Sequence, residues 1–309
     1  MLFRSSAATA PAAERAKRAI ARVDSLMSNW TTTSEVARIN RLAARETVIV
    51  QPEVALVVDS SLALWRASGG AFDMTVEPLV RAWGFLGGPR HVPTDSAARA
   101  AAALVGSERV HFERSSRRLW FDREGVRIDL GGIAKGWAVD QAARALRMAG
   151  ITNALVDLTG NMAALGAPPG REHWTIGVRD PHDRTPYFAH LALLPGDCIS
   201  TSGKYEQFVA ADGRTFGHIM DPRTGRPAEG TISVTVISRS ALTCDSWDTP
   251  LFVLGAREAR EKAKAHAEFA AILVTPGEAG VDTVWVEAAL ASRFVLEPGE
   301  ERRFRVVVF

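Results

Sequence analysis

The sequence contains little cysteine and no large excess of charge of either sign. Cys198 and Cys244 are its two cysteines in 309 residues, and neither lies in a CxxC or similar spacing. This excludes a disulfide framework and a cysteine-based metal site. The formal net charge is +2, the basic residues are scattered, and no DNA- or RNA-binding motif is present. We therefore expect no nucleic-acid partner.

Long apolar runs are also missing. No run approaches the 18 or so residues of a transmembrane helix, so no membrane span is expected. The alanine-rich start has no apolar core followed by a cleavage site. We interpret residues 1–11 as a frayed N-terminus. The chain as written is expected in the cytoplasm, whereas a longer natural N-terminus would place it in the periplasm or at the membrane.

The remaining composition is that of a globular protein, with 47% hydrophobic and 23% charged residues. Neither repeats nor low-complexity linkers occur, which predicts a single domain over residues 1–309. Short strand-like segments come in close pairs, as at 109–112 with 118–122, which favours antiparallel pairing. Helices are expected at 12–29, 35–42, 52–69, 76–83, 94–104, 134–148 and 242–266, with Pro250 interrupting or restarting the last. The predicted fold class is α+β, with short, mostly antiparallel or mixed sheets flanked by helices.

The stretch Asp129-Leu130-Gly131-Gly132-Ile133-Ala134-Lys135-Gly136 joins a short apolar segment to an amphipathic helix. A helix N-terminus offers unpaired N–H groups and partial positive charge to an anion. Gly131 and Gly132 permit a close backbone approach, and Lys135 adds a full positive charge. Asp129 could cap the helix or accept hydrogen bonds from a ligand. The alternative is an ordinary turn between a strand and a helix.

Three further groups of residues suggest chemistry. Asp245 and Thr249 are spaced i, i+4, so they share one helix face and offer oxygen ligands for Mg²⁺ beside a phosphate. Asp245 could instead cap the helix. His218 precedes a turn and is a candidate general base or a structural histidine. The segment 200–203 is a hydroxyl-rich phosphate loop or only a turn. The aromatic residues Trp30, Phe72 and Trp137 are interpreted as stacking partners for a ring system or as core residues.

Taken in order, these blocks resemble the ApbE family, the FAD:protein FMN transferases. The resemblance extends from about Val23 to Gly255 and rests on Met27-Ser28, Ser34-Glu35, Asn40, Gly70-Ala71-Phe72-Asp73, Trp83-Gly84-Phe85, Asp129 to Gly136, Leu155-Val156-Asp157, Thr201-Ser202-Gly203, His218 to Pro227, Asp245 to Thr249 and Leu254-Gly255. It implies FAD as substrate, Mg²⁺ as cofactor, FMN transfer to a threonine or serine of an acceptor flavoprotein, and AMP as product.

The same resemblance assigns roles to residues. It implies metal ligands at Asp245, Thr249 and the backbone carbonyl of Gly132. His218 would deprotonate the acceptor hydroxyl. Contacts with the flavin nucleotide are implied at Trp30, Ala71, Phe72, Asp73, Asp129, Lys135, Ile219 and Asp248.

The chain also departs from the family pattern. No Met-Gly-Thr strand precedes the first helix, and the block Asp-Ala-Gly-Gly-Asp reads Asp157-Leu158-Thr159-Gly160-Asn161. Two other functions stay open: an FAD pyrophosphatase, in which the same site uses water as acceptor, and a non-catalytic FAD-binding protein, which these departures favour.

Overall fold

The computed structural model describes residues 9–211 and 213–309, which form two compact units. The first unit contains the described residues up to Ile20 together with 135–205 and 229–309, and the second contains 21–134 and 206–228. Both units are discontinuous, so no linker in the sequence marks their boundary. The single domain predicted from the sequence stays a prediction. Of the predicted frayed start, residues 1–8 lie outside the described part, whereas α1 (Thr9–Met27) already includes the last three.

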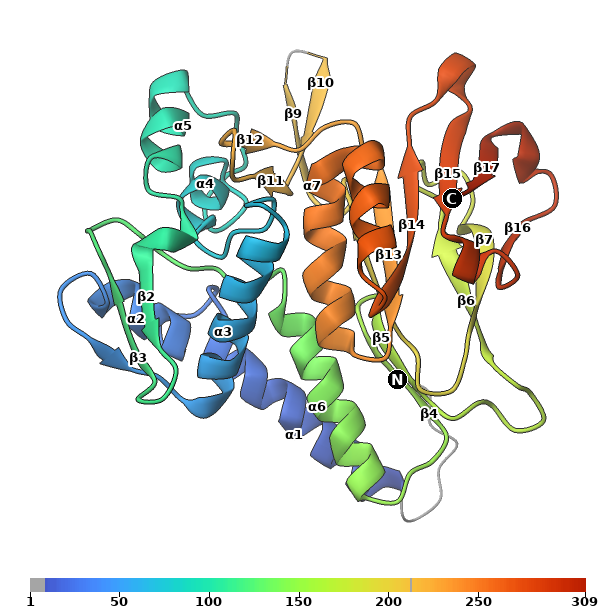
Figure 1. The fold of residues 1–309 in the computed structure, drawn as a ribbon, viewed down its shortest axis with the longest axis horizontal. Coiled ribbons are helices and arrows are strands. Elements are labelled where there is room, and N and C mark those ends of the chain that lie inside the picture. The colour runs from blue at the N-terminus through green and yellow to red at the C-terminus, as the bar shows by residue number, and fades with distance from the viewer. Residues whose placement is uncertain (1–8, 212) are drawn as a thin grey trace. The chain divides into compact units, whose positions relative to one another are not determined.

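A seven-stranded sheet forms the centre of the first unit (Figure 1). Its strand order is β17-β15-β14-β13-β8-β5-β4, and every neighbouring pair is antiparallel except β15 and β17. The mainly antiparallel, mixed sheet confirms the predicted fold class. The strands are β4 (Ala154–Leu158), β5 (Asn161–Leu165), β8 (Cys198–Gly203), β13 (Ser233–Ser238), β14 (Phe269–Thr275), β15 (Asp282–Val286) and β17 (Phe304–Val308).

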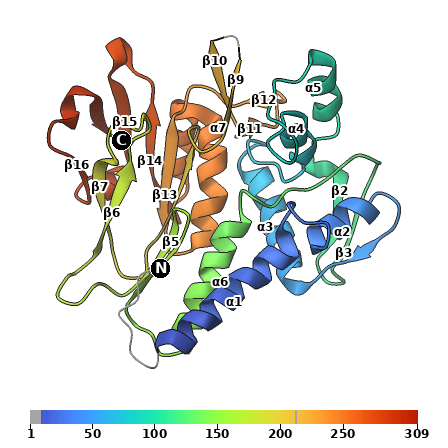
Figure 2. The same cartoon turned by 180° about the vertical axis from the view of Figure 1, so that it is seen from behind.

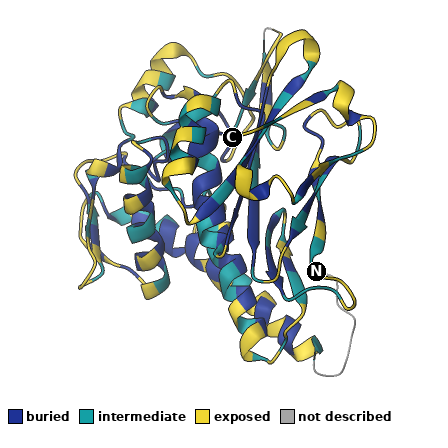
Figure 3. Ribbon diagram, turned by 45° about the vertical axis from the view of Figure 1, so that its right-hand side comes forward, coloured by how far each residue is buried: buried dark blue, intermediate teal, exposed yellow. Residues whose placement is uncertain are grey.

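The two faces of this sheet are covered by different elements. Helix α7 (Ala241–Ala265) packs on one face across β8, β13 and β14, and α6 (Ala134–Met148) lies beside it (Figure 2). A three-stranded sheet of β6 (Trp174–Arg179), β7 (Tyr187–Leu193) and β16 (Phe294–Leu296) covers the other face. Phe188 and Leu191 of β7 pack there with Ile199 of β8 and Ile272 of β14. As Figure 3 shows, the central strands are buried between these layers.

Two sequence expectations about the first unit are wrong. The hydroxyl-rich segment 200–203 is neither a loop nor a turn, because it belongs to β8, which pairs with β5 and β13. Its alternate side chains face opposite layers, with Ile199 in the core and Ser200 toward α7. Pro250 does not interrupt α7. The residue of that helix with non-helical backbone angles is Gly255, at φ 73°.

The second unit contains most of the remaining helices. Ser34 caps α2 and Thr94 caps α5, each accepting a hydrogen bond from the N–H three residues later, as the sequence predicted. Side chains of α4, β9 and β11, including Leu79, Val209 and Met220, share one apolar core. The helices are α2 (Glu35–Leu42), α3 (Pro52–Ala67), α4 (Glu77–Ala82) and α5 (Asp95–Ala102). The strands are β1 (Val48–Ile49), β2 (Val110–Glu113), β3 (Arg118–Phe121), β9 (Phe208–Ala211), β10 (Arg214–Gly217), β11 (Met220–Asp221) and β12 (Arg226–Pro227).

Four single-turn 3-10 helices complete the described elements: η1 (Ser107–Arg109), η2 (Glu278–Gly280), η3 (Ala288–Leu290) and η4 (Glu300–Arg302). Among the helices of residues 9–211 and 213–309, none is both long and apolar enough to cross a lipid bilayer.

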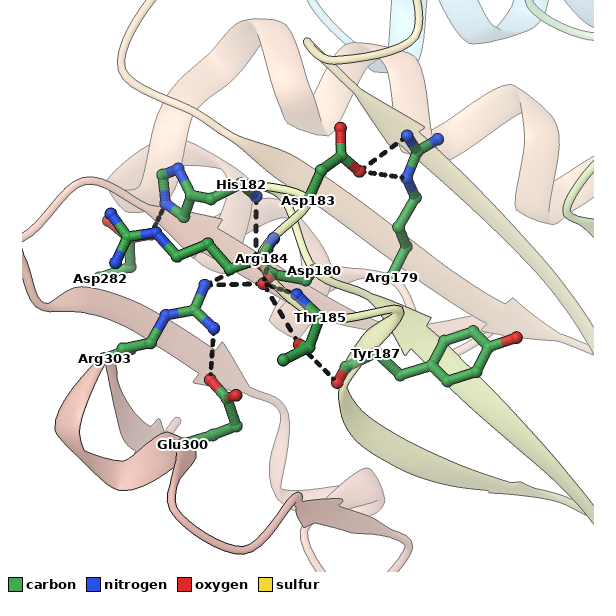
Figure 4. Close-up of polar contacts among 10 residues, drawn as sticks. All are labelled: Arg179, Asp180, His182, Asp183, Arg184, Thr185, Tyr187, Asp282, Glu300 and Arg303. Carbon is green, nitrogen blue, oxygen red and sulfur yellow. Dashed lines mark hydrogen bonds and ion pairs between the residues drawn. The ribbon is translucent and has the colours of Figure 1, made fainter.

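A buried polar cluster fixes the loop between β6 and β7 to the start of β17 (Figure 4). Asp180 is fully buried, and its carboxylate accepts hydrogen bonds from the backbone N–H groups of His182, Arg184 and Thr185 at 2.9–3.1 Å. Arg303, which directly precedes β17, donates to both carboxylate oxygens at 2.7 and 2.8 Å. Asp180 therefore holds together segments that are far apart in the sequence.

We predict that Asp180→Asn lowers the free energy of unfolding by about 3 kcal/mol or more, because it removes the buried negative charge that accepts from Arg303 and from three backbone N–H groups, and leaves Arg303 only Glu300 as an anion. Asp183→Asn is the matched control. Asp183 pairs with Arg179 at the exposed side of the same loop, where an ion pair contributes at most about 1 kcal/mol. Urea unfolding followed by circular dichroism measures both variants. Equal losses in the two variants would contradict the role given to Asp180.

The contribution of Asp180 to the free energy of unfolding should depend on pH. Burial by itself would raise the pKa of Asp180, but the hydrogen bonds from His182, Arg303 and Thr185 lower it below the ordinary value of 3.8. A lowered folded-state pKa gives stability that is fully present above pH 3.8 and is lost as the pH falls through the folded-state pKa. The stability difference between wild type and Asp180→Asn should therefore shrink below that pH.

Candidate functional site

Helix α7 presents two buried carboxylates one turn apart. Asp245 is 1% exposed and Asp248 is 2% exposed. Both lie inside the helix, whose N-cap is Ser240, which excludes the alternative that Asp245 is a cap. The i, i+4 pair Asp245 and Thr249 lies on one helix, as predicted from the spacing.

The Asp245 carboxylate is held by the first turn of α6. Its Oδ2 accepts a hydrogen bond from the backbone N–H of Gly136 at 2.8 Å, and its Oδ1 lies 3.6 Å from Lys135 Nζ. The predicted site residues Lys135 and Asp245 are thus brought together. Because Lys135 is about half exposed, it can also face a ligand while it neutralises Asp245.

The Asp248 carboxylate is surrounded by hydroxyl groups. Ser200 donates to Oδ2 at 2.5 Å, while Ser202 and Thr249 donate to Oδ1 at 2.9 and 3.2 Å. Burial and the negative charge of Asp245 raise the pKa of Asp248 to about 8, against the opposing effects of Lys135 and the two serines. Sequence reasoning missed the serines as its partners.

This arrangement fits a hard divalent cation. Two buried carboxylates face one lysine, so the group has an excess of negative charge when both are ionised. Within residues 9–211 and 213–309, no group of three or more His, Cys, Asp or Glu side chains could hold a metal. A cation here would therefore need the Thr249 hydroxyl and ligands that are not acidic side chains. Gly132, the predicted carbonyl ligand, belongs to the second unit, three residues before Lys135.

Two residues of α6 that sequence reasoning did not single out fix the position of α7. A Cβ on Gly136 would lie 2.2 Å from the Ala241 carbonyl oxygen and 2.6 Å from the Asp245 Cβ. One turn later, Asp140 accepts hydrogen bonds from the N–H groups of Ala241 and Leu242 and from the Ser240 hydroxyl at 2.9–3.0 Å.

In the second unit, Trp30 is 71% exposed and lines a pocket of about 840 Å³. Asn29 and Asn40 both donate to the Ile128 carbonyl, and Asn40 accepts from the Ile128 N–H at 2.7 Å. The loop that carries Trp30 is therefore tied to the segment that leads directly into Asp129. The exposed indole fits the predicted stacking role.

The predicted contacts Ala71, Phe72 and Asp73 are all buried. Both carboxylate oxygens of Asp73 accept hydrogen bonds within the unit, from Thr75 and Ser107 at 2.6–2.9 Å. The Asp73 side chain therefore stabilises the local fold around Thr75 and Ser107. The contact with a ligand that was predicted for Asp73 would have to come from its backbone.

The glycine turn adopts a compact conformation ahead of α6. Asp129 Oδ1 accepts a hydrogen bond from the Gly131 N–H at 2.8 Å, and the N–H groups of Ile133 and Ala134 donate to the Leu130 carbonyl. Gly131 is exposed and Gly132 is half-buried. Asp129 thus organises the turn rather than capping the helix itself.

His218 directly follows β10 and is half-buried. Its Nδ1 lies 3.3 Å from the Gln207 carbonyl oxygen, and its ring meets the Phe85 ring edge-on at 6.3 Å between centroids. A carbonyl can only accept, so this contact favours the tautomer with the proton on Nδ1, which makes Nε2 the basic nitrogen. The neighbouring Ile219 is buried, and its carbonyl accepts from the Ala228 N–H.

The predicted residues thus fall into two groups. The first unit contains Lys135, Asp245, Asp248 and Thr249, and the second contains Trp30, Ala71, Phe72, Asp73, Asp129, Gly132, His218 and Ile219.

Known proteins similar to this chain are described as ApbE-family proteins and FAD:protein FMN transferases. The model of the ApbE family matches residues 2–273. The FAD:protein FMN transferase of Vibrio cholerae is 35% identical over 255 residues, which cover 81% of this chain and 75% of that protein. The one of Salmonella typhimurium is 33% identical over 260 residues, or 82% and 74%.

Solved structures agree with this similarity. The flavin transferase ApbE from Vibrio cholerae matches with a TM-score of 0.83 at 29% identity, covering 94% of this chain and 93% of that chain. The ApbE protein from Thermotoga maritima matches with a TM-score of 0.81 at 32% identity, covering 88% and 89%.

We predict that Gly136→Ala destabilises the protein by about 2 kcal/mol or more, because overpacking at a helix contact outweighs the gain in helix propensity of about 1 kcal/mol. Exposed Arg144 of the same helix supplies the control, since its alanine variant should be more stable than its glycine variant. Thermal and urea unfolding measure whether each variant is more or less stable than the wild type. A Gly136→Ala variant as stable as wild type would show that α6 and α7 do not need this close approach.

Proposed function

The chain belongs to the ApbE family, and from this we propose that it is a magnesium-dependent FAD:protein FMN transferase. Its substrate is FAD, its acceptor is a threonine or serine hydroxyl of a flavoprotein, and its second product is AMP. FMN becomes attached to the acceptor through a phosphoester bond.

The reaction requires one bond to form and one to break. The acceptor oxygen attacks the phosphorus of the FMN half, and the bond from that phosphorus to the bridging oxygen breaks, so that oxygen leaves with AMP. His218 Nε2 takes the hydroxyl proton as the new bond forms. Lys135 faces the phosphates, and Trp30 stacks on the ring system. Bound Mg²⁺ would neutralise phosphate charge and stabilise the leaving group.

The observation that supports this function best is the buried pair Asp245 and Asp248 one turn apart on α7, with Lys135 beside Asp245 and hydroxyl groups around Asp248. A buried carboxylate pair with a single lysine is costly for stability, and a bound cation would offset that cost. Asp245, Thr249 and the Gly132 carbonyl would hold the metal, while Asp248 orients Thr249 through its hydrogen bond.

Incubation with FAD and Mg²⁺, with and without an acceptor flavoprotein, tests the function. We expect flavin fluorescence on the acceptor after denaturing electrophoresis and one AMP released per flavin attached. Release of AMP without attachment would identify a pyrophosphatase, and unchanged FAD would identify a binding protein. Either result overturns the proposal.

Asp245 should be essential for the metal-dependent step. We predict that Asp245→Asn lowers FAD cleavage at least 100-fold, on the scale of the loss of a positioned charged group, and that added Mg²⁺ does not restore it. Asp245→Asn keeps the side-chain shape, so melting temperature shows whether the fold is retained. Glu261→Ala removes an exposed carboxylate from the same helix and is the control. Full activity of Asp245→Asn at ordinary Mg²⁺ would exclude Asp245 as a ligand.

His218 should act on the acceptor and not on FAD binding. We predict that His218→Ala lowers FMN transfer by about 100-fold or more, whereas FAD affinity is retained. Transfer by wild type should rise with pH through one ionisation, because the base must be neutral before it can take the proton. Single-turnover transfer is the measurement, and His91→Ala, an exposed histidine of the same unit, is the control. Lost FAD affinity with unchanged transfer at saturating FAD would make His218 a ligand contact.

A further inference from the structure

The pocket beside Trp30 has an unusual charge. Four arginines and one glutamate line it, all from the second unit. Arg41 and Arg45 come from α2, Arg81 from α4 and Arg127 from the segment before the glycine turn. Arg45 is paired with Glu124 at 2.9 Å, so this pair contributes no net charge. The remaining arginines determine the electrostatic character of the pocket.

Arg81 and Arg127 share a single anion. Both donate to the same oxygen, Oε1 of Glu77, at 2.6 and 2.9 Å. Glu77 is fully buried, and its Oε2 has no hydrogen-bond partner in the described part of the chain. One carboxylate thus holds two guanidinium groups in place and leaves one positive charge uncompensated at the pocket wall. Such a rigid pair of arginines is suited to a second carboxylate or phosphate.

Arg41 adds a further positive charge. It is exposed on α2 and makes no ion pair with the residues described. Trp30 lies in the same pocket and is the expected flavin contact, so an occupant of the pocket lies next to the flavin. Leu86 and Gly87 form another part of the wall and directly follow Phe85, whose ring contacts that of His218. The pocket therefore contains the flavin contact, and its wall is linked to His218 through Phe85.

From this placement we infer that the pocket receives an acidic segment of the acceptor protein, whose carboxylates lie against Arg41 and the Arg81–Arg127 pair. The wall is linked to His218 through Phe85, so a segment of the molecule that brings a hydroxyl to His218 can reach it, and the uncompensated guanidinium groups select acidic flanking residues. The inference rests on the proposed function, because it assigns the acceptor to the pocket. It adds the chemical class of acceptor that the enzyme recognises.

Synthetic peptides test the inference without knowledge of the acceptor. One peptide has a central threonine flanked by aspartates, and its partner has asparagine at each aspartate position. We expect the acidic peptide to bind the wild-type protein and Arg41→Glu to weaken that binding about 5- to 10-fold, on the scale of one or two partly screened ion pairs. The preference should shrink between 50 and 500 mM salt, a range over which the screening length becomes short.

Arg66→Glu is the matched control, since Arg66 is exposed on α3 of the same unit and outside the pocket. Its affinity for the acidic peptide should equal that of the wild type. Arg127→Gln is a second variant, with circular dichroism to confirm folding. It should weaken acidic-peptide binding in the same direction as Arg41→Glu.

Several results would overturn the inference. Equal affinity for the two peptides would exclude acidic recognition, and equal effects of Arg41→Glu and Arg66→Glu would exclude the pocket. An affinity for AMP or for FAD that falls in Arg41→Glu as much as that for the peptide would assign the pocket to a nucleotide. The proposed function has its own test: it fails if the wild-type protein never cleaves FAD. Peptide binding is measured without FAD cleavage, so the two failures can be told apart.

Discussion

The close approach of α6 to α7 at Gly136 is the constraint on which the carboxylate site depends. With no side chain at this position, the backbone N–H of Gly136 reaches the Asp245 carboxylate and the two helices pack at backbone distance. Asp140, one turn along α6, caps the start of α7 through two backbone N–H groups. These two contacts set both the depth and the rotation of α7. The side chains of Asp245 and Thr249, which lie one turn apart on α7, are placed through this helix position.

The carboxylate site lowers the stability of the fold, because it buries ionisable groups. An unpaired buried carboxylate is among the most costly groups in a protein interior, and Asp248 is fully enclosed by α7 and β8. The hydroxyl groups of Ser200 and Ser202 reduce the cost because they donate hydrogen bonds without adding charge. A positively charged partner in their place would have neutralised the carboxylate and removed its attraction for a cation. The polar face of β8 thus lowers the cost of burying Asp248.

Local signals in the sequence were sufficient for most helices. Caps at Ser34 and Thr94 and the apolar stripe of 134–148 predict helix ends that the structure confirms. Strand β8 could not be predicted, because its serines make the segment look like a polar turn. They are hydrogen-bond donors to Asp248, which lies 46 to 48 residues away in the sequence. Gly136 acts on a carboxylate 109 residues later, which no local pattern reveals. The division into two units was hidden for the same reason, since each unit combines distant segments.

The interleaved chain path of the first unit has a consequence for synthesis on the ribosome. Most of the second unit is one continuous segment, 21–134, and can begin folding early, whereas the seven-stranded sheet is completed only by β17, residues 304–308. Until its later neighbour has been made, each strand that ends up central is an unpaired edge of a partly formed sheet: β8 before β13, β13 before β14, and β15 before β17. Non-local and parallel pairings form slowly, and exposed strand edges associate with other chains. The first unit is therefore the part of this protein that nascent-chain chaperones would have to shield.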